Sequence, residues 1–274
     1  MLCFPNAKIN IGLNIITRRP DNFHNVETVF YPVPLSDILE IIEKQDDSET
    51  KAELILSGKE IPGSKETNLC IKAYQLLDAD FNLPPVKIYL HKIIPMGAGL
   101  GGGSSDGANA LKLIDQVFDL KLTNLQLADY ASQLGSDCTF FIENKPAFGT
   151  GKGNVLEKLV LNLSEKYLVL VKPQVFVGTA EAYEGVIPQK PLTSIKQVIH
   201  LSPDNWKGKI INDFEKSVFI KHPEIKTIKE TMYGQGAVYA SMTGSGSAVY
   251  GIFEKEVTIK HFFEGMFYWG GKLV

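Results

Sequence analysis

Apolar and polar residues alternate near the start of the chain. Apolar residues hold every second position from Ile9 to Ile15, and the positions between them hold Lys8, Asn10, Gly12 and Asn14. Since side chains on a strand point alternately to opposite faces, this pattern predicts a strand over residues 7–15 with one buried side and one solvent-facing side. Lys8 and Asn10 then lie together on the polar side, roughly 6.5 to 7 Å apart along the strand.

A second region predicts a strand, a glycine-rich loop and a helix in succession. The alternation that starts at Val86 predicts a strand reaching Ile94, and five glycines follow within residues 97–103. Apolar residues at helical spacing then predict a helix through residues 110–118, which Ser104, Ser105 or Asp106 can cap. Free backbone amides and the positive end of the helix dipole would face the loop, which is typical of a phosphate-binding site.

The remaining patterns predict an α+β protein with two domains, residues 1–161 and 162–274. In the first domain, strands are expected at 26–33, 38–43 and 53–56, and helices at 68–77, after a Thr67 cap, and from the Thr123–Gln126 capping box to Gly135. In the second domain, strands are expected at 167–171, 237–242 and 248–253, and helices at 179–183, 195–199, 210–219 and before Gly234, with a last helix and strand. The order βα…αββαβ is the split pattern of a ferredoxin-like domain.

Composition narrows the class of protein. A net charge of −3 and a pI near 6.0 argue against nucleic-acid or membrane-surface partners. The N-terminus lacks a basic region followed by an apolar core, so we expect a cytoplasmic protein. The three cysteines show no C-x-x-C spacing, which predicts reduced thiols and neither zinc nor disulfides.

Several phosphate-binding loops contain glycines at similar spacing. The Walker pattern is excluded because no lysine follows Gly103. The dinucleotide pattern G-x-G-x-x-G is matched by Gly97, Gly99 and Gly102, but the acidic residue expected at the end of the next strand is absent, since Asp119 ends a helix. The partner motifs of protein kinases are also absent from the sequence.

The loop Pro95-Met-Gly-Ala-Gly-Leu-Gly-Gly-Gly-Ser-Ser105 resembles the P-x-G-x-G-L-G-x-S-S loop of the GHMP kinases, named after galactokinase, homoserine kinase, mevalonate kinase and phosphomevalonate kinase. Pro5-x-x-Lys8-x-Asn10 is similar to the first motif of that superfamily, and the turn Thr243–Ser247 is similar to its third. This resemblance implies an N-terminal domain like the second domain of ribosomal protein S5 and a ferredoxin-like C-terminal domain. It also implies a kinase that uses ATP and Mg²⁺ to phosphorylate an alcohol.

Two further runs resemble one branch of the superfamily. They are Asp21-Asn-Phe-His24 and Leu134-Gly-Ser-Asp137, and the triple glycine of the loop supports them. That branch phosphorylates the 2-hydroxyl of a cytidine diphosphate-linked methylerythritol in the non-mevalonate route to isoprenoid (terpenoid) precursors. Phe23 stands where this branch usually has tyrosine, so a hydroxyl group is missing there.

The resemblance assigns roles to individual residues. It implies catalysis by Lys8 and Asp137, with Asp137 either accepting the hydroxyl proton or orienting the hydroxyl group. It implies magnesium contact through Ser104 or Ser105. It implies substrate contacts from Asn10, His24, Phe30 and Tyr183, and ATP contacts from Asn68, Leu69, Pro95, Met96, Gly97, Ala98, Gly99, Leu100, Gly101, Gly102, Gly103, Ser104, Ser105, Gly244 and Ser245.

Three other functions stay open at this point. Another GHMP member, such as a mevalonate or homoserine kinase, is disfavoured by the loop around His24 and by the triple glycine. A nucleotide-binding regulator without turnover is disfavoured by the presence of both Lys8 and Asp137. The hypothesis of a dinucleotide-dependent reductase is supported only by the match of Gly97, Gly99 and Gly102 to the G-x-G-x-x-G pattern. We expect a monomer or a weak homodimer.

Overall fold

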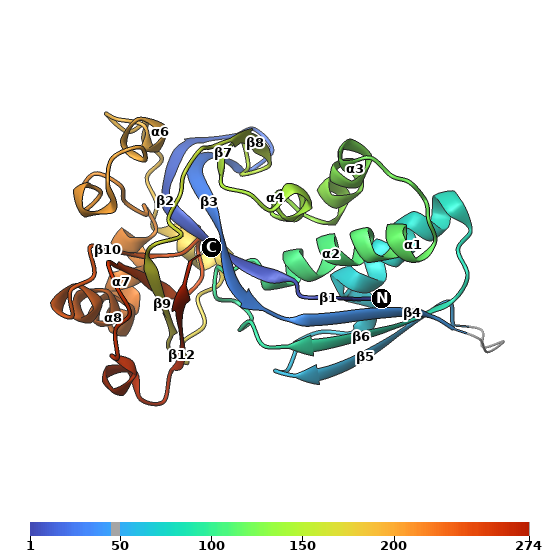
Figure 1. Ribbon diagram of the computed structural model, residues 1–274. Helices are drawn as coiled ribbons and strands as arrows, with labels where there is room; N and C mark the ends of the chain where they lie inside the picture. The colour runs from blue at the N-terminus through green and yellow to red at the C-terminus, as the bar shows by residue number, and fades with distance from the viewer. Residues whose placement is uncertain (45–49, 274) are drawn as a thin grey trace. The chain divides into compact units, whose positions relative to one another are not determined.

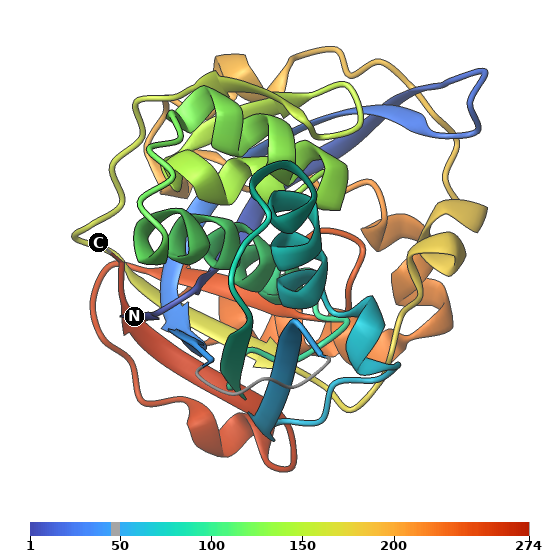
Figure 2. The same ribbon diagram turned by 90° about the vertical axis from the view of Figure 1, so that its right-hand side faces the viewer.

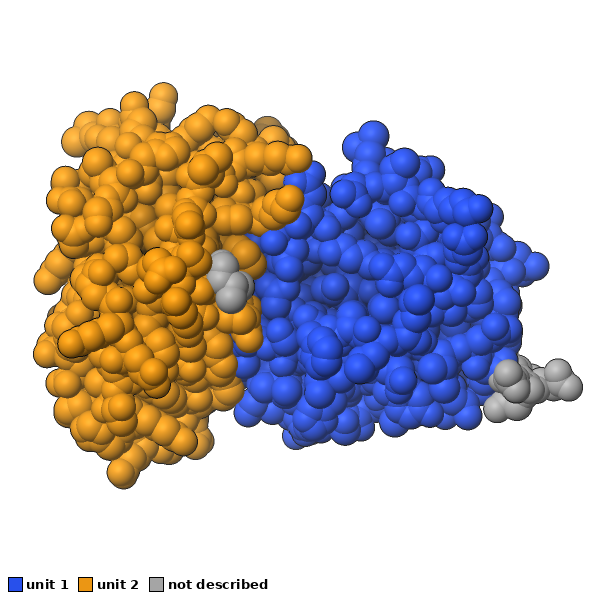
Figure 3. Space-filling model, viewed as in Figure 1, with its two compact units in different colours: residues 1–7, 35–96, 101–144 blue, residues 8–34, 97–100, 145–274 orange. Residues whose placement is uncertain are grey.

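The computed structural model describes residues 1–44 and 50–273, and these form two compact units (Figure 1, Figure 3). Unit 1 comprises residues 1–7, 35–96 and 101–144, and unit 2 comprises residues 8–34, 97–100 and 145–274. Both units are therefore built from segments that are distant in the sequence. Since a compact unit need not coincide with a domain, the predicted division into residues 1–161 and 162–274 stays a prediction.

Unit 1 is a four-stranded sheet with helices over one face (Figure 1, Figure 2). The strand order is β1 (Leu2–Cys3), β4 (Ile38–Glu43), β6 (Val86–Lys92) and β5 (Ala52–Gly58). Only β5 and β6 are parallel among these pairs, and α1 (Leu69–Phe81) connects them. The other elements of this unit are η1 (Lys65–Thr67), α2 (Gly102–Val117), α3 (Asn124–Leu134) and α4 (Cys138–Glu143).

Two predicted helix caps in unit 1 are wrong and one is confirmed. Asn68 caps α1, because its side chain accepts a hydrogen bond from the Cys70 amide, whereas Thr67 lies in the preceding η1 turn. Gly101 caps α2, so Ser104, Ser105 and Asp106 lie inside the helix and do not cap it. The capping box of Thr123 and Gln126 and the end of α3 at Gly135 are confirmed.

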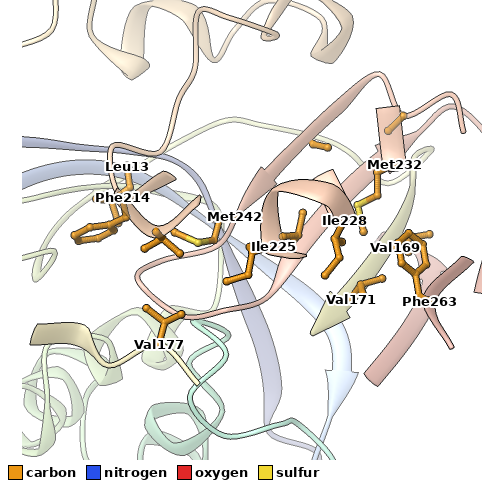
Figure 4. Close-up of a cluster of buried hydrophobic side chains, with 14 of the residues drawn as sticks. Leu13, Val169, Val171, Val177, Phe214, Ile225, Ile228, Met232, Met242 and Phe263 are labelled. Carbon is orange, nitrogen blue, oxygen red and sulfur yellow. The ribbon is translucent and has the colours of Figure 1, made fainter. Parts of the chain in front are cut away.

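Unit 2 contains a sheet with the chain order of a ferredoxin-like domain. Its strands are β10 (Tyr239–Met242), β11 (Val249–Phe253), β9 (Tyr167–Lys172) and β12 (Phe267–Lys272), all paired antiparallel. If these four strands are numbered from 1 to 4 along the chain, their order in the sheet is 2-3-1-4, as the split βαβ pattern predicts. The helices α7 (Glu215–Lys221) and α8 (Pro223–Gly234) contribute to a shared apolar core, which includes Val169, Val171, Ile225, Ile228 and Met232 (Figure 4). Burial of this apolar surface stabilises the unit.

A second sheet, most of which lies in unit 2, has the order β2 (Asn6–Arg18), β3 (His24–Ser36), β7 (Ala147–Thr150) and β8 (Val155–Lys158). The unit also contains α5 (Thr179–Glu184), α6 (Ile195–Val198), η2 (Pro203–Asn205) and η3 (Lys260–Phe263). The predicted last helix is thus only a 3₁₀ turn. Among the described residues, no helix is long and apolar enough to span a membrane.

The helix predicted over residues 210–219 begins only at Glu215. Asn212 instead forms an isolated bridge with Leu13 of β2, in which the Leu13 amide donates to the Ile211 carbonyl at 2.9 Å and the Asp213 amide donates to the Leu13 carbonyl at 2.8 Å. Pairing with a strand has therefore overridden the helical spacing of the apolar residues.

The polar side of β2 does not face solvent, which corrects the expectation from the alternating pattern. Lys8 and Asn10 are each 3% exposed and Asn14 is 4% exposed. At Gly12, an added Cβ would lie 2.5 Å from Ile210 Cγ2 and 2.8 Å from Ile195 Cδ1. Segments from much later in the sequence therefore cover this side of the strand.

Candidate active site

Lys8 and Asn10 lie at the centre of a buried polar cluster in unit 2. Lys8 Nζ donates to Asn10 Oδ1 at 2.6 Å and to the Gly99 carbonyl at 2.9 Å. Asn10 Nδ2 donates to Thr28 Oγ1 at 3.0 Å, which fixes the orientation of the amide. The prediction that Lys8 and Asn10 lie side by side on β2 is confirmed. Lys8 Nζ also lies 5.5 Å from the centroid of the Phe30 ring.

Two glycine-rich segments of unit 2 pack backbone against backbone beside this cluster. Gly99 has a φ of +73°, and a Cβ added there would lie 2.0 Å from the Thr243 carbonyl oxygen. A Cβ added at Gly246 would lie 2.2 Å from the Gly99 amide nitrogen. Thr243 Oγ1 accepts from the Asn10 amide at 3.0 Å and donates to the Gly99 carbonyl at 3.1 Å. Only glycine permits this approach of the main chains.

The C-terminal part of the loop begins α2 in unit 1. The first helical turn leaves backbone amides free to bind an anion. A Cβ added at Gly103 would meet nothing within 4 Å, so open space adjoins this turn. Ser105 is fully buried and its Oγ accepts from Asn109 Nδ2 at 3.3 Å, whereas Ser104 is half-buried. Ser104 is therefore the better placed of the two candidate magnesium contacts.

Unit 1 contains a cavity of about 170 Å³ next to the start of α2. Its size is similar to that of a protein cavity of roughly 150 Å³ that binds benzene, so one flat ring system fits. Among its lining residues are four that the sequence assigned to ATP, namely Asn68, Leu69, Met96 and Gly103. The structure therefore brings these four residues together around one space.

Asp106 lines the same cavity and was missed as a site residue. Lys92 Nζ donates to Asp37 Oδ2 and, at 2.6 Å, to Asp106 Oδ2, and all three side chains are buried. Asp106 Oδ1 is buried and has no hydrogen-bond partner among the described residues. The sequence signal was a lysine and an aspartate at opposite ends of the glycine loop, but the aspartate was interpreted as a possible helix cap.

Burial raises the pKa of Asp106 to about 7, an effect that Lys92 opposes and Asp37 reinforces. Because the pKa of Asp106 is higher in the folded than in the unfolded protein, the free energy of unfolding of the wild type falls as the pH rises from about 4 to about 7.

The Asp106→Asn variant cannot ionise at this position, so its free energy of unfolding should not fall for this reason. We expect it to gain roughly 2 to 4 kcal/mol of stability relative to the wild type between about pH 4 and about pH 7. Urea unfolding at several pH values measures this difference. Parallel pH profiles for the two proteins would contradict it, and the exposed Asp129→Asn serves as control.

His24 and Tyr183, both assigned to the substrate, lie against each other in unit 2. Their ring centroids are 4.7 Å apart with an interplanar angle of 17°, and Tyr183 also packs edge-on against Phe214 at 4.8 Å. Burial and the Arg18 charge lower the pKa of His24, so the imidazole is neutral at pH 7. His24 and Tyr183 therefore form a stacked pair, and His24 covers one face of the Tyr183 ring.

The other residues near the predicted substrate site differ in exposure. Phe30 is 2% exposed and packs on Gly149, where an added Cβ would lie 2.5 Å from the Phe30 ring. Phe23 is 56% exposed, and Lys152 Nζ lies 4.5 Å from its ring centroid, a cation–π contact that the sequence did not predict.

Asp137 occupies the N-cap position of α4 in unit 1, but its side chain makes no capping hydrogen bond. Lys8 belongs to unit 2 and Asp137 to unit 1. Their convergence on one substrate stays a prediction, as do the roles of the other assigned residues.

Comparison with known proteins gives consistent matches. Residues 68–145 match the GHMP kinases N terminal domain and residues 187–268 match the GHMP kinases C terminal family. The chain is 53% identical over 268 residues to the 4-diphosphocytidyl-2-C-methyl-D-erythritol kinase of Bacteroides fragilis, covering 97% of both chains. It is 48% identical to the enzyme of the same name from Parabacteroides distasonis, covering all of both chains.

Solved structures agree with these matches. A crystal structure of 4-(cytidine 5′-diphospho)-2C-methyl-D-erythritol kinase superimposes with a TM-score of 0.77 at 30% identity, covering 92% of this chain and 90% of that one. The mevalonate kinase of Methanococcus jannaschii gives a TM-score of 0.70 at 17% identity, covering 100% and 98%, which supports the fold alone.

Proposed function

Since the chain belongs to the GHMP kinase family, among the 4-diphosphocytidyl-2-C-methyl-D-erythritol kinases, we propose that it phosphorylates the 2-hydroxyl of 4-(cytidine 5′-diphospho)-2-C-methyl-D-erythritol. ATP, the phosphate donor of this family, becomes ADP. The reaction belongs to the non-mevalonate pathway to isoprenoid precursors. The observation that carries this proposal is the match over nearly the whole chain to kinases of this one specificity. The family assignment also confirms the predicted two-domain α+β fold.

Phosphoryl transfer depends mainly on positioning and on stabilisation of negative charge. We assign the terminal phosphates of ATP to the glycine-rich loop of residues 97–105, at whose end α2 begins. Lys8 supplies a fixed positive charge beside the Gly99 carbonyl. Asn10 holds the Lys8 ammonium group at 2.6 Å and thereby limits its orientation. This arrangement would stabilise charge as the γ-phosphate moves to the acceptor.

Magnesium, when bound, neutralises charge on the phosphate oxygens. We propose that Ser104 contacts it, because Ser105 is fully buried and already bonded to Asn109. No group of three or more His, Cys, Asp or Glu side chains suited to a metal occurs in residues 1–44 and 50–273. The chain would thus bind magnesium largely through the nucleotide, as is common for this ion.

We place the purine base in the 170 Å³ cavity of unit 1. Asn68 and Leu69 line it, and Asp106 Oδ1, which has no partner among the described residues, can accept a hydrogen bond from an amino group. A ring in this cavity would satisfy a buried oxygen that is otherwise costly to leave unpaired.

We place the cytosine ring beside the stacked rings of His24 and Tyr183, in contact with His24. Replacing His24 with alanine should raise the KM for the cytidylated substrate roughly tenfold, because a stacking and hydrogen-bonding partner is removed. The KM for ATP should stay within twofold, and steady-state kinetics with each substrate varied in turn measures both values. His261→Ala, a change in the η3 turn, is the matched control. An unchanged KM for the cytidylated substrate would mean that the pyrimidine binds elsewhere.

The experiment that tests the proposed activity offers the purified protein ATP, Mg²⁺ and one acceptor at a time. The acceptors are the cytidylated methylerythritol, mevalonate, homoserine and galactose, and ADP release is followed. We expect turnover of the first compound only. Preference for another acceptor would reject the specific assignment, and ATP binding without turnover of any acceptor would favour a regulator. The predicted cytoplasmic location and the predicted monomer or weak homodimer stay predictions.

A further inference from the structure

We propose that Phe176 is a positioning residue for the nucleotide loop, holding Gly97 in the conformation that opens the loop toward phosphate. Phe176 lies in the segment of unit 2 between β9 and α5, residues 173–178. The inference rests on the proposed function only in taking residues 97–105 as the phosphate-binding loop.

The Phe176 ring lies directly against Gly97. Gly97 has a φ of +61°, and a Cβ added there would lie 2.5 Å from Phe176 Cε2 and 2.8 Å from Cδ2. The Gly97 α-carbon therefore presses on the edge of the ring, and only a hydrogen fits between them. A residue with positive φ at the start of a loop needs support from its surroundings, because the conformation is easily exchanged for others. The ring supplies that support at Gly97.

The residues on either side of Phe176 are fixed to the unit. Ser247 Oγ donates to the Val175 carbonyl at 2.8 Å, and Val177 is 3% exposed in the apolar core. Thr179 Oγ1 and Ser245 Oγ share a hydrogen bond of 3.3 Å. The backbone at residue 176 is therefore held in place, and this fixes where its ring can lie.

Phe176 itself contributes little to the core, since 69% of its surface is exposed. Burial in the core therefore does not explain this large apolar side chain. Its contact with Gly97 of the loop explains it better. The next two loop residues are held differently. The Ala98 carbonyl accepts from the Ala248 amide at 3.4 Å, and the Gly99 carbonyl accepts from Lys8 and Thr243. Phe176 thus extends the support of the loop by one residue toward its start.

The same segment leads directly into α5, which carries Tyr183. Thr179, at the first position of α5, bonds to the 243–247 turn, and Tyr183 stacks on His24. Residues 173–183 therefore connect the proposed pyrimidine-binding ring with the phosphate-binding main chain. Loss of the Phe176 ring should affect the nucleotide side of this connection first.

The test compares ATP binding by Phe176→Ala with that of the wild type, using calorimetry with Mg²⁺ and no acceptor. We expect the Kd for ATP to rise roughly 3- to 10-fold, as for loss of one aromatic contact, and the KM for the acceptor to stay within twofold. Phe176→Leu and Phe176→Tyr should restore most of the affinity. Phe262→Ala, which truncates another exposed phenylalanine of unit 2 with 47% exposure, should leave the Kd unchanged.

An unchanged Kd for ATP in Phe176→Ala would overturn the proposal. So would a parallel rise in the Kd for ATP and the KM for the acceptor together with a lower unfolding temperature, since that pattern indicates a general structural role. Because the Kd is measured without acceptor, this test stays informative even if the cytidylated compound proves not to be the substrate.

Discussion

Replacing Asp137 with asparagine is expected to lower kcat by about 10³-fold and to leave the KM for ATP within twofold. The carboxylate is assigned to the acceptor hydroxyl, and general-base or orienting groups typically contribute between about 10² and 10⁴ in rate. Asparagine has nearly the same shape but cannot take up the hydroxyl proton. Steady-state kinetics with the cytidylated substrate, together with ATP binding by calorimetry, measures both quantities.

The structure makes this substitution a clean test. The Asp137 side chain makes no capping hydrogen bond to α4, so its replacement should cost the helix little stability. Asp129→Asn, in the exposed part of α3 in the same unit, is the matched control and should retain full activity. A kcat within tenfold of the wild type for Asp137→Asn would remove Asp137 from the catalytic assignment.

Replacing Lys8 with methionine should lower kcat by roughly 10² to 10³ and, unlike Asp137→Asn, should also raise the KM for ATP several-fold. The loss of rate follows from removing a positive charge preorganised for the transition state. The loss of affinity follows from the contact of Lys8 Nζ with the Gly99 carbonyl, because without it this loop oxygen and Asn10 Oδ1 each lose a donor. Methionine keeps most of the aliphatic stem, so the buried site stays filled.

Kinetics with ATP and acceptor varied separately measures the two effects of Lys8→Met. The exposed Lys190→Met, also in unit 2, controls for the loss of a charge and should behave as the wild type. Full turnover of Lys8→Met would show that the ammonium group only holds the loop. A lower kcat without any change in the KM for ATP would show that its bond to Gly99 is not needed to shape the nucleotide site.

The local geometry of the site could largely be predicted from sequence, but its surroundings could not. Alternation along β2 correctly placed Lys8 beside Asn10, because strand periodicity depends only on the backbone. The same alternation wrongly predicted a solvent-facing side. That side is covered by Ile195 and Ile210, and no local pattern near β2 contains information about residues two hundred positions later.

The glycine loop shows the same division between local and distant information. Its composition predicts a phosphate-binding site, which stays a prediction, whereas the helix after it was correctly predicted, although Gly101 and not a serine holds the N-cap position. The importance of Asp106 could not be predicted, since it depends on a cavity whose walls come from residues 56–69 as well as from the loop. Likewise, the bridge between Asn212 and Leu13, which precedes α7, could not be predicted from the sequence around residue 212 alone.

The segments of the two units alternate along the sequence, and this order affects how the chain folds during synthesis. Unit 1 is complete once residue 144 has left the ribosome, so it can fold during translation. Leu13 of β2 is among the first residues synthesised, yet its partners Ile211 and Asp213 emerge about two hundred residues later. Until these partners emerge, one edge of β2 is unpaired and can pair with the wrong strand. The N-terminal part of the nascent chain must therefore be protected from mispairing for longer than unit 1.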